Sequence, residues 1–273
     1  VVESRFACGL SLLGDSERDP LRTTTRGVGE LIQEAEGAGA SRVYVGLGGS
    51  ATADGGTGMA GTWGWNFLDE SGQRLTSSAE LEKLHATTPG RAPRVTLVGL
   101  CDVNNPLTGP DGAVMYVGQK GGSLGDELIA TRGLSRLAQI VSSAGGQDFH
   151  TVPGSGAAGG LGFGILAFGG GSLVSGASWV LAAKDFDHEL GNADLVVTGE
   201  GCYDQTSLRG KLSGEVLRRC ADAGVPALLV APDVRPADTY GSTLITGGGV
   251  WDARELFRRT RDGVEAALRL LAS

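Results

Sequence analysis

The stretch DPLRTTTRGVGELIQEAEGAGASRVYVGLGG, residues 19–49, contains two structural patterns in succession and decides the fold class. Over 27–38, apolar residues recur at helical spacing, which predicts an amphipathic helix with Leu31 and Ile32 on its buried face. Glycines end this pattern, and a continuous apolar run over 42–47 follows them. Such a run is typical of a strand that is buried on both faces of a parallel sheet.

The same alternation of strand and helix continues along the chain. Elements that alternate in this way pack as an α/β fold, with helices covering a mostly parallel sheet. A change of composition over 182–194 predicts a domain boundary, with residues 1–187 on one side and 188–273 on the other. Further strands are predicted at 94–103, 193–201 and 225–234, further helices at 132–145, 212–224 and 253–271, and a closely packed interior segment at 154–180.

Composition argues against several classes of function. The formal net charge is −8 and the chain has no run of Lys and Arg, so we expect no nucleic-acid-binding surface. No apolar run is long enough to cross a bilayer and no signal-peptide pattern is visible, so we expect no membrane association. The four cysteines form no Cys-x-x-Cys pair, which favours reduced thiols and a cytoplasmic location.

The glycine-rich segment after the first predicted strand is the first candidate for a binding site. Glycine accounts for 47 of the 273 residues, against a usual share of ~7%. In this segment Gly48, Gly49, Ser50 and Thr52 can present backbone N–H groups and hydroxyls to an anion. The structural alternative is a tight turn that satisfies its own hydrogen bonds.

A second interpretation of the same segment comes from the pattern Gly-x-Gly-x-x-Ala over 46–51. This pattern matches the dinucleotide fingerprint, in which a helix begins directly after the glycines and an acidic residue further on binds the ribose. Asp69 lies near the distance at which that acidic residue is expected. The pattern therefore leaves an NAD-dependent oxidoreductase as an alternative function.

Polar residues also follow the second predicted strand. Asp102 lies at its C-terminal end, Asn105 follows closely, and Lys120 comes after a turn rich in Gly and Pro. Ligands of open α/β sheets bind at the carboxyl ends of the strands, so these side chains are suited to a metal ion or a hydroxyl-bearing substrate. An Asx turn is the structural alternative for Asp102.

The third predicted strand leads into a similar group. Glu200, Asp204 and Lys211 follow it, and Lys211 directly precedes a predicted helix. Carboxylates can hold Mg²⁺ or accept a substrate proton, and a lysine can neutralise a phosphate, so the group is typical of phosphoryl transfer. The structural alternative is an ion pair of one of these carboxylates with Lys211 or Arg209.

Taken together, these segments resemble the type I glycerate kinase family. The signature stretches are several, long and in matching order, which makes the resemblance more specific than the dinucleotide fingerprint. The stretches that carry it are GLGGSATADGGTGM (46–59), CDVNNPLTGPDGA (101–113), GQKG (118–121), VPGSGAAGGLGFG (152–164) and VVTGEGCYDQTSLRGK (196–211).

The resemblance implies ATP-dependent phosphorylation of D-glycerate to 2-phosphoglycerate, with ATP and Mg²⁺ as the cofactors. It implies two α/β domains with the site between them: residues 1–187 as an inserted domain and 188–273 as the C-terminal part of a Rossmann-like domain. It also implies three sets of site residues. These are Asp102, Asp204, Lys211 and Glu200 for catalysis, Gly48, Gly49, Ser50, Thr52, Asp54, Asn105 and Lys120 for binding substrate and nucleotide, and Glu200 and Asp204 for the metal.

The start of the chain departs from the family pattern. Members of the family begin with a βαβ-type segment that carries an Asp-Ser-Phe-Lys-Gly-like loop, and no such loop is present in this sequence. We therefore expect a truncated chain whose Rossmann-like domain is incomplete, with exposed strand edges that a homodimer would cover. A catalytically degenerate glycerate-binding protein is the alternative that this departure suggests.

Overall fold

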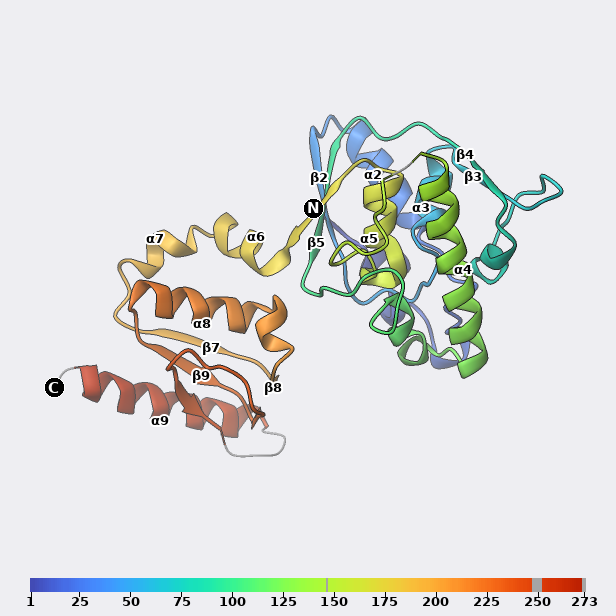
Figure 1. Ribbon diagram of the computed structural model, residues 1–273. Helices are drawn as coiled ribbons and strands as arrows, with labels where there is room; N and C mark the ends of the chain where they lie inside the picture. Colours follow the sequence, from blue (N-terminus) through green and yellow to red (C-terminus); the bar gives the residue numbers. More distant parts are fainter. Residues whose placement is uncertain (146, 247–251, 272–273) are drawn as a thin grey trace. The chain divides into compact units, whose positions relative to one another are not determined.

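The structure, a computed structural model, describes residues 1–145, 147–246 and 252–271. The chain divides into two compact units, residues 1–174 and 175–273. Both units alternate strands with helices and contain parallel sheets, which confirms the predicted α/β class (Figure 1). The assignment of 1–187 and 188–273 to the two domains of the family stays a prediction.

The first unit is built on a four-stranded sheet in the order β1-β2-β5-β6, with β1, β2 and β5 mutually parallel. Val43 pairs with Leu97 and Gly46 with Leu100, so β2 and β5 end at the same edge of the sheet. The strands and helices of this unit are β1 (Val2–Glu3), α1 (Arg5–Cys8), α2 (Arg26–Gly37), β2 (Arg42–Gly46), α3 (Thr57–Thr62), β3 (Asn66–Leu68), β4 (Ala86–Thr88), β5 (Thr96–Cys101), α4 (Leu124–Ser143), α5 (Ala157–Ala167) and β6 (Ser172–Ser175).

Helix α2 and strand β2 fall within one residue of the predicted bounds. Val28 and Ile32 of α2 are fully buried, but Leu31 is 41% exposed, so its predicted place on the buried face is wrong. Successive side chains on a helix differ in direction by about 100°, so Leu31 and Ile32 cannot both point to the centre of a narrow buried face.

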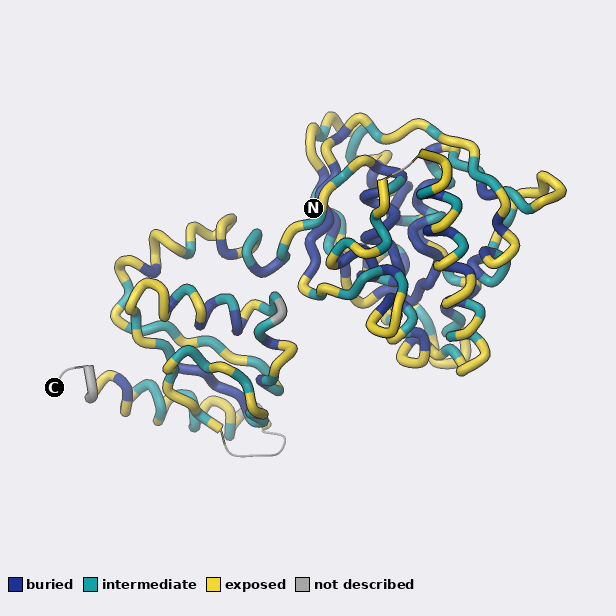
Figure 2. Tube along the Cα trace, in the orientation of Figure 1, coloured by how far each residue is buried: buried dark blue, intermediate teal, exposed yellow. Residues whose placement is uncertain are grey.

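The glycine-rich segment at 154–180 lies in the interior where it forms α5, as predicted. A Cβ atom added at Gly164 would lie 2.8 Å from the Cα of Gly56, so the two backbones approach too closely for side chains at these positions. Figure 2 shows buried residues along α5 and along the neighbouring β5.

The second unit contains a parallel three-stranded sheet in the order β11-β9-β7 and a separate pair, β10 with β8. Buried Leu228 and Leu229 of the central strand and Leu217 of α8 contribute to the cores of this unit. Its elements are α6 (Gly176–Ala183), α7 (Phe186–Leu190), β7 (Val196–Gly199), β8 (Cys202–Tyr203), α8 (Leu212–Ala223), β9 (Ala227–Val230), β10 (Asp233–Val234), β11 (Thr243–Ile245) and α9 (Ala253–Leu271).

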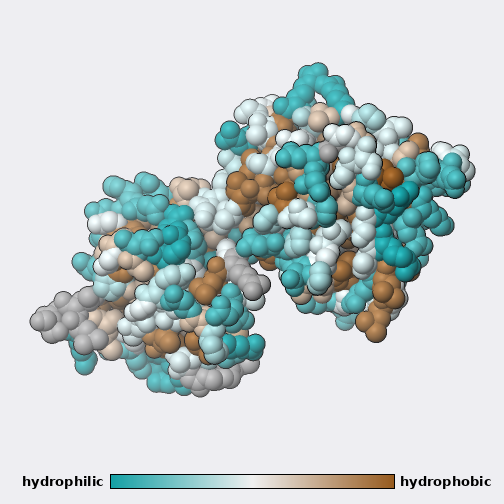
Figure 3. All heavy atoms as spheres, in the orientation of Figure 1, coloured by the Kyte–Doolittle hydropathy of each residue, from teal (hydrophilic) through white to brown (hydrophobic). Residues whose placement is uncertain are grey.

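The surface is mixed in character. Figure 3 shows hydrophobic residues scattered among hydrophilic and neutral ones on the visible face of each unit. Within the described part of the chain, no helix combines the length and apolar character needed to cross a membrane. The four cysteines are free thiols, as the sequence predicts.

Candidate functional site

A pocket of about 200 Å³ lies in the first unit, at the edge where β2 and β5 end. Three segments that are distant in sequence form its wall: 47–50 after β2, 116–120, and 157–159 at the start of α5. We call it the lysine pocket, and it is lined by Leu10, Leu47, Gly48, Gly49, Ser50, Val103, Tyr116, Gln119, Lys120, Ala157, Ala158 and Gly159.

Lys120 is the one cation among the described lining residues, and its side chain is buried. The residue is 6% exposed, and its Nζ donates hydrogen bonds to Ser50 Oγ at 3.2 Å and to the carbonyl oxygen of Thr52 at 2.6 Å. No carboxylate oxygen of the described residues forms an ion pair with it. An ammonium group has three donors, so one N–H remains for a ligand.

Burial lowers the pKa of Lys120 to about 8, although the nearby Cys8 and Asp54 act in the opposite direction. Cys8 supplies no compensating charge at neutral pH, because burial raises the pKa of its thiol to about 12. A buried cation without a carboxylate partner is costly in an empty pocket and is stabilised when an anion binds beside it. The electrostatics of the lysine pocket therefore favour an anionic ligand.

The backbone at the start of α5 explains the glycines of this pocket. Ala158, Gly159 and Gly160 have φ values of 52°, 69° and 89°, which turn the chain through the left-handed region. A Cβ atom at Gly159 would lie 1.8 Å from the carbonyl oxygen of Thr52 and 3.0 Å from Lys120 Nζ. Ala158 holds the same conformation at a cost of about 1–2 kcal/mol, and strain of this kind concentrates at functional sites.

The predicted site residues of the first glycine-rich segment are divided between the wall of the lysine pocket and the interior behind it. Gly48, Gly49 and Ser50 line the lysine pocket. Thr52 lies behind it, fully buried, and its hydroxyl donates to the carbonyl oxygen of Ala158 at 3.4 Å. The carbonyl of Thr52, rather than its hydroxyl, therefore contributes to the pocket by holding Lys120.

Asp54 is 3% exposed and organises the surrounding loops. Its carboxylate accepts hydrogen bonds from Thr25 N at 2.8 Å, Thr25 Oγ1 at 2.9 Å, Gly56 N at 3.0 Å and Gly58 N at 3.2 Å. Burial raises the pKa of this carboxyl, while these donors lower it. Asp54 therefore ties the segment before α2 to the start of α3, and it faces a second pocket rather than the lysine pocket.

At the end of β5, Asp102 is exposed and the next residue, Val103, lines the lysine pocket. Asn105 donates from Nδ2 to the carbonyl oxygen of Asp111 at 2.7 Å and accepts from the Tyr116 hydroxyl at 3.1 Å. Because Tyr116 lines the pocket, Asn105 positions part of its wall.

In the second unit, Glu200 and Lys211 meet at the junction of β7 and α8. Lys211 Nζ lies 3.1 Å from Glu200 Oε2, and the Ser213 hydroxyl donates to Oε1. The side chains of Glu200 and Lys211 are 16% and 39% exposed. The ion pair named as the structural alternative is thus present, and it holds the lysine at the start of α8.

Asp204 lies in the turn between β8 and α8. Its Oδ1 accepts from the backbone N–H and the hydroxyl of Thr206, at 2.8 Å and 2.5 Å, and these bonds hold the pKa of Asp204 below its usual range. Its Oδ2 lies 4.0 Å from the Cys202 sulfur. Asp204 is therefore ionised at neutral pH and has one oxygen outside the turn.

The described residues contain no group of three His, Cys, Asp or Glu side chains arranged to hold a metal ion. This arrangement does not argue against Mg²⁺, because Mg²⁺ in kinase sites is bound by one or two carboxylates together with phosphates and water. Of the two predicted metal ligands, Glu200 is engaged through both oxygens, and Asp204 Oδ2 is the more available.

The geometry required by the dinucleotide fingerprint is not present after β2. The next helix, α3, begins at Thr57, so five residues separate it from the pattern at 46–51, and it is only six residues long. Asp69 lies beside the antiparallel pair β3-β4, where its carboxylate accepts from Ser71 and Gln73 in a turn. Asp69 is thus a turn residue in this fold.

Residues that the sequence interpretation did not assign to a site include Tyr116, Gln119 and Gly159 of the lysine pocket and Ser213 beside Glu200. The glycine pair at 159 and 160 gave a signal for Gly159, because consecutive glycines inside a helical segment indicate close backbone contact. No local pattern pointed to Tyr116 or Ser213.

The geometry of the first unit defines an α/β protein with an anion-binding pocket around a buried lysine. The profile of the "Glycerate kinase family" matches residues 1–256, and the chain belongs to this family. The chain is 40% identical to a glycerate kinase of Bacillus subtilis (strain 168) over 240 residues, which are 86% of this chain and 63% of that protein. It is 35% identical to a glycerate 2-kinase of Escherichia coli (strain K12), over 100% of this chain and 74% of that protein.

A crystal structure of a protein from Salmonella typhimurium LT2, assigned as glycerate kinase 2, has the same fold. Its TM-score with this chain is 0.77 at 32% sequence identity, over 98% of this chain and 75% of that one. The chain thus spans less than two thirds of the length of the Bacillus subtilis relative and about three quarters of the other two.

Proposed function

We propose that the chain transfers the terminal phosphoryl group of ATP to D-glycerate and forms 2-phosphoglycerate, with Mg²⁺. The observation that carries this proposal is the family match over 1–256, which contains every predicted site residue. The relatives described as glycerate kinases support the substrate, and the Escherichia coli relative, described as a glycerate 2-kinase, supports carbon 2.

The lysine pocket supplies what this chemistry requires from the protein. Phosphoryl transfer passes through a loose transition state with charge on the equatorial oxygens, so catalysis depends on positioning and on charge compensation. Lys120 offers a buried positive charge with one donor left for a phosphate oxygen. A preorganised donor in a water-poor pocket stabilises developing charge more strongly than a donor in solvent.

The residues of the second unit supply the remaining proposed roles. Asp204 Oδ2 would serve as an oxygen ligand of Mg²⁺, which compensates phosphate charge when bound. Glu200 holds Lys211 and Ser213, so we assign it to positioning Lys211 for a phosphate and to the outer surroundings of the metal. Asp102 or Asp204 orients the glycerate hydroxyl.

A coupled assay tests the proposal directly. The full product of the gene is given D-glycerate, ATP and Mg²⁺, and 2-phosphoglycerate is detected with enolase in the absence of a mutase. We expect turnover in the wild type, a loss of about 10²-fold or more in kcat for Lys120→Met, and no loss for Lys83→Met, which removes an exposed lysine.

Three results would contradict the proposal: no product from the wild type, glycerate binding without formation of ADP, or an unchanged kcat in Lys120→Met. The second of these would indicate the glycerate-binding protein named above. Comparison of Asp102→Asn with Asp204→Asn then separates the two carboxylates, because loss of a metal ligand raises the Mg²⁺ requirement, whereas loss of the orienting carboxylate lowers kcat at saturating Mg²⁺.

A further inference from the structure

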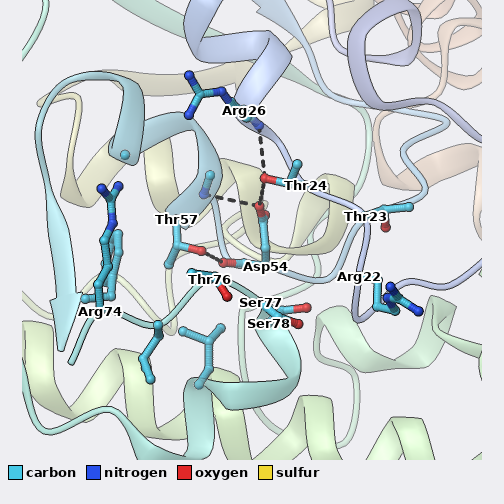
Figure 4. Close-up of a pocket in the computed structure, with 15 residues that line it drawn as sticks. Arg22, Thr23, Thr24, Arg26, Asp54, Thr57, Arg74, Thr76, Ser77 and Ser78 are labelled. Carbon is cyan, nitrogen blue, oxygen red and sulfur yellow. Dashed lines mark hydrogen bonds between the residues drawn. The ribbon is translucent and has the colours of Figure 1, made fainter. Parts of the chain in front are cut away.

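A second pocket of about 320 Å³ lies in the first unit, separate in its lining residues from the lysine pocket. Its wall is formed by the segment before α2, by the loop at Asp54 with the start of α3, and by the segment between β3 and Leu81 (Figure 4). We call it the arginine pocket, and it is lined by Arg22, Thr23, Thr24, Arg26, Asp54, Thr57, Gly58, Gly61, Phe67, Arg74, Leu75, Thr76, Ser77, Ser78 and Leu81.

Two of its three arginines carry uncompensated charge. Arg26 forms an ion pair with Glu30 at 2.8 Å. Arg22 and Arg74 are exposed, and the described part of the chain gives neither guanidinium an ion pair or a hydrogen bond. In Figure 4 they lie on either side of four hydroxyl-bearing residues, Thr57, Thr76, Ser77 and Ser78, which we call the floor. Two unpaired arginines at one pocket are unusual in a chain with a net charge of −8 and favour a negatively charged ligand.

Asp54 is the only acidic residue among the described residues that line this pocket. Its carboxylate is 3% exposed and accepts hydrogen bonds from Thr25, Gly56 and Gly58. Because these donors satisfy it within the protein, Asp54 is not available as the partner of Arg22 or Arg74.

The hydroxyl groups of the floor are prearranged as acceptors. Thr57, Ser77 and Ser78 each donate the hydroxyl proton to a backbone carbonyl oxygen at 2.8 Å. A hydroxyl that has used its proton keeps lone pairs, so it can only accept from a ligand. The pocket thus presents donors from arginines beside acceptors from hydroxyls.

We propose that the arginine pocket binds a small phosphate monoester that carries free hydroxyl groups, such as the phosphate ester of a short polyol. The anionic group is held by Arg22 and Arg74, and the ligand hydroxyls donate to the oxygens of the floor. A volume of about 320 Å³ is at the small end for ligand pockets and suits a molecule of this size. The site uses none of the residues that line the lysine pocket.

Isothermal titration calorimetry with glycerol 3-phosphate tests the site, because this probe is neither substrate nor product of the proposed reaction. The variant Arg22→Ala/Arg74→Ala removes both unpaired charges. The control Arg91→Ala/Arg94→Ala removes two exposed arginines outside the pocket, so the net charge changes equally. Circular dichroism checks that each variant is folded.

We expect the Arg22/Arg74 variant to bind glycerol 3-phosphate at least about tenfold more weakly, since each charge-assisted hydrogen bond is worth about that factor or more. The control should stay within about twofold of the wild type, which is the size of a screened long-range effect. Propyl phosphate, which lacks the hydroxyls, should bind the wild type several-fold more weakly than glycerol 3-phosphate.

Absence of binding to the wild type, or equal losses in the variant and the control, would overturn the proposal. Equal affinities for propyl phosphate and glycerol 3-phosphate would overturn the role of the hydroxyl-bearing floor.

Discussion

The substitution Lys120→Met tests whether the buried lysine is maintained for function at the expense of stability. The pKa of Lys120 falls from 10.5 to about 8 in the folded chain, and burial is the main cause. Between these two values the unfolded chain binds the proton and the folded chain does not, so the free energy of unfolding rises with pH in this window. Each pKa unit corresponds to about 1.4 kcal/mol, which gives about 3 kcal/mol across the window.

Near neutral pH the charged ammonium therefore opposes folding by about 3 kcal/mol. Its two hydrogen bonds, to Ser50 and Thr52, recover about 1 kcal/mol each or less. We expect Lys120→Met to be about 1–2 kcal/mol more stable than the wild type at about pH 7, and less stable above pH 10.5.

The assay is equilibrium unfolding in urea at a series of pH values, without phosphate, for the wild type, Lys120→Met and Lys83→Met. Subtracting the free energy of unfolding of each variant from that of the wild type cancels the contributions of the cysteines and tyrosines, which titrate in the same pH range in all three proteins. Lys83 is exposed, so its variant should show no such pH-dependent difference. A constant difference between the wild type and Lys120→Met at all pH values would refute the reasoning, because it would mean that water reaches Nζ.

Three further predictions, the first with a control substitution, test other parts of the structure. Gly159→Ala should lower the free energy of unfolding by at least about 3 kcal/mol, because its Cβ would lie 1.8 Å from a carbonyl oxygen at a φ of +69°. The control Gly39→Ala, at a φ of +89° in open space, should lower the free energy of unfolding by only about 1–2 kcal/mol. Equal decreases of Tm in the two glycine variants would contradict the close contact at Gly159. Asp54→Asn should cost about 1–3 kcal/mol in urea unfolding, because an amide nitrogen would then face backbone donors, and a neutral result would mean that the carboxyl is protonated. A hydrogen bond from Arg218 is the main cause that lowers the pKa of Glu215 from 4.5 to about 2, so stability from this group is present above pH 4.5 and is lost as pH falls toward 2. In Glu215→Gln, the loss of unfolding free energy between pH 4.5 and pH 2 should be smaller by about 1–2 kcal/mol, a value reduced because Arg218 is half-exposed and its charge is screened by solvent. An acid-unfolding curve equal to that of the wild type would contradict this prediction.

Several features followed from local sequence patterns, because the patterns and the structures they specify have the same length scale. The apolar run after the glycines at 37 and 39 is a strand, and the periodic stretch at 253–271 is a helix with the predicted bounds. The position of Asp102 at the end of β5 and of Glu200 at the end of β7 followed in the same way. The local patterns gave wrong predictions at Leu31 and at the apparent dinucleotide fingerprint. In both cases the pattern depends on residue type alone and carries no information about the backbone direction and packing around it.

By itself the sequence determined the α/β class, the order of the elements and the strand ends that carry polar side chains, because backbone periodicity and glycine conformation act over a few residues. Only the tertiary structure decided that Lys120 meets Ser50, 70 positions away in the chain, and that the pair is buried. It likewise brought Arg22 and Arg74 to one pocket from separate segments. Desolvation and charge depend on every group that surrounds an atom in space, and no pattern of neighbouring residues records them.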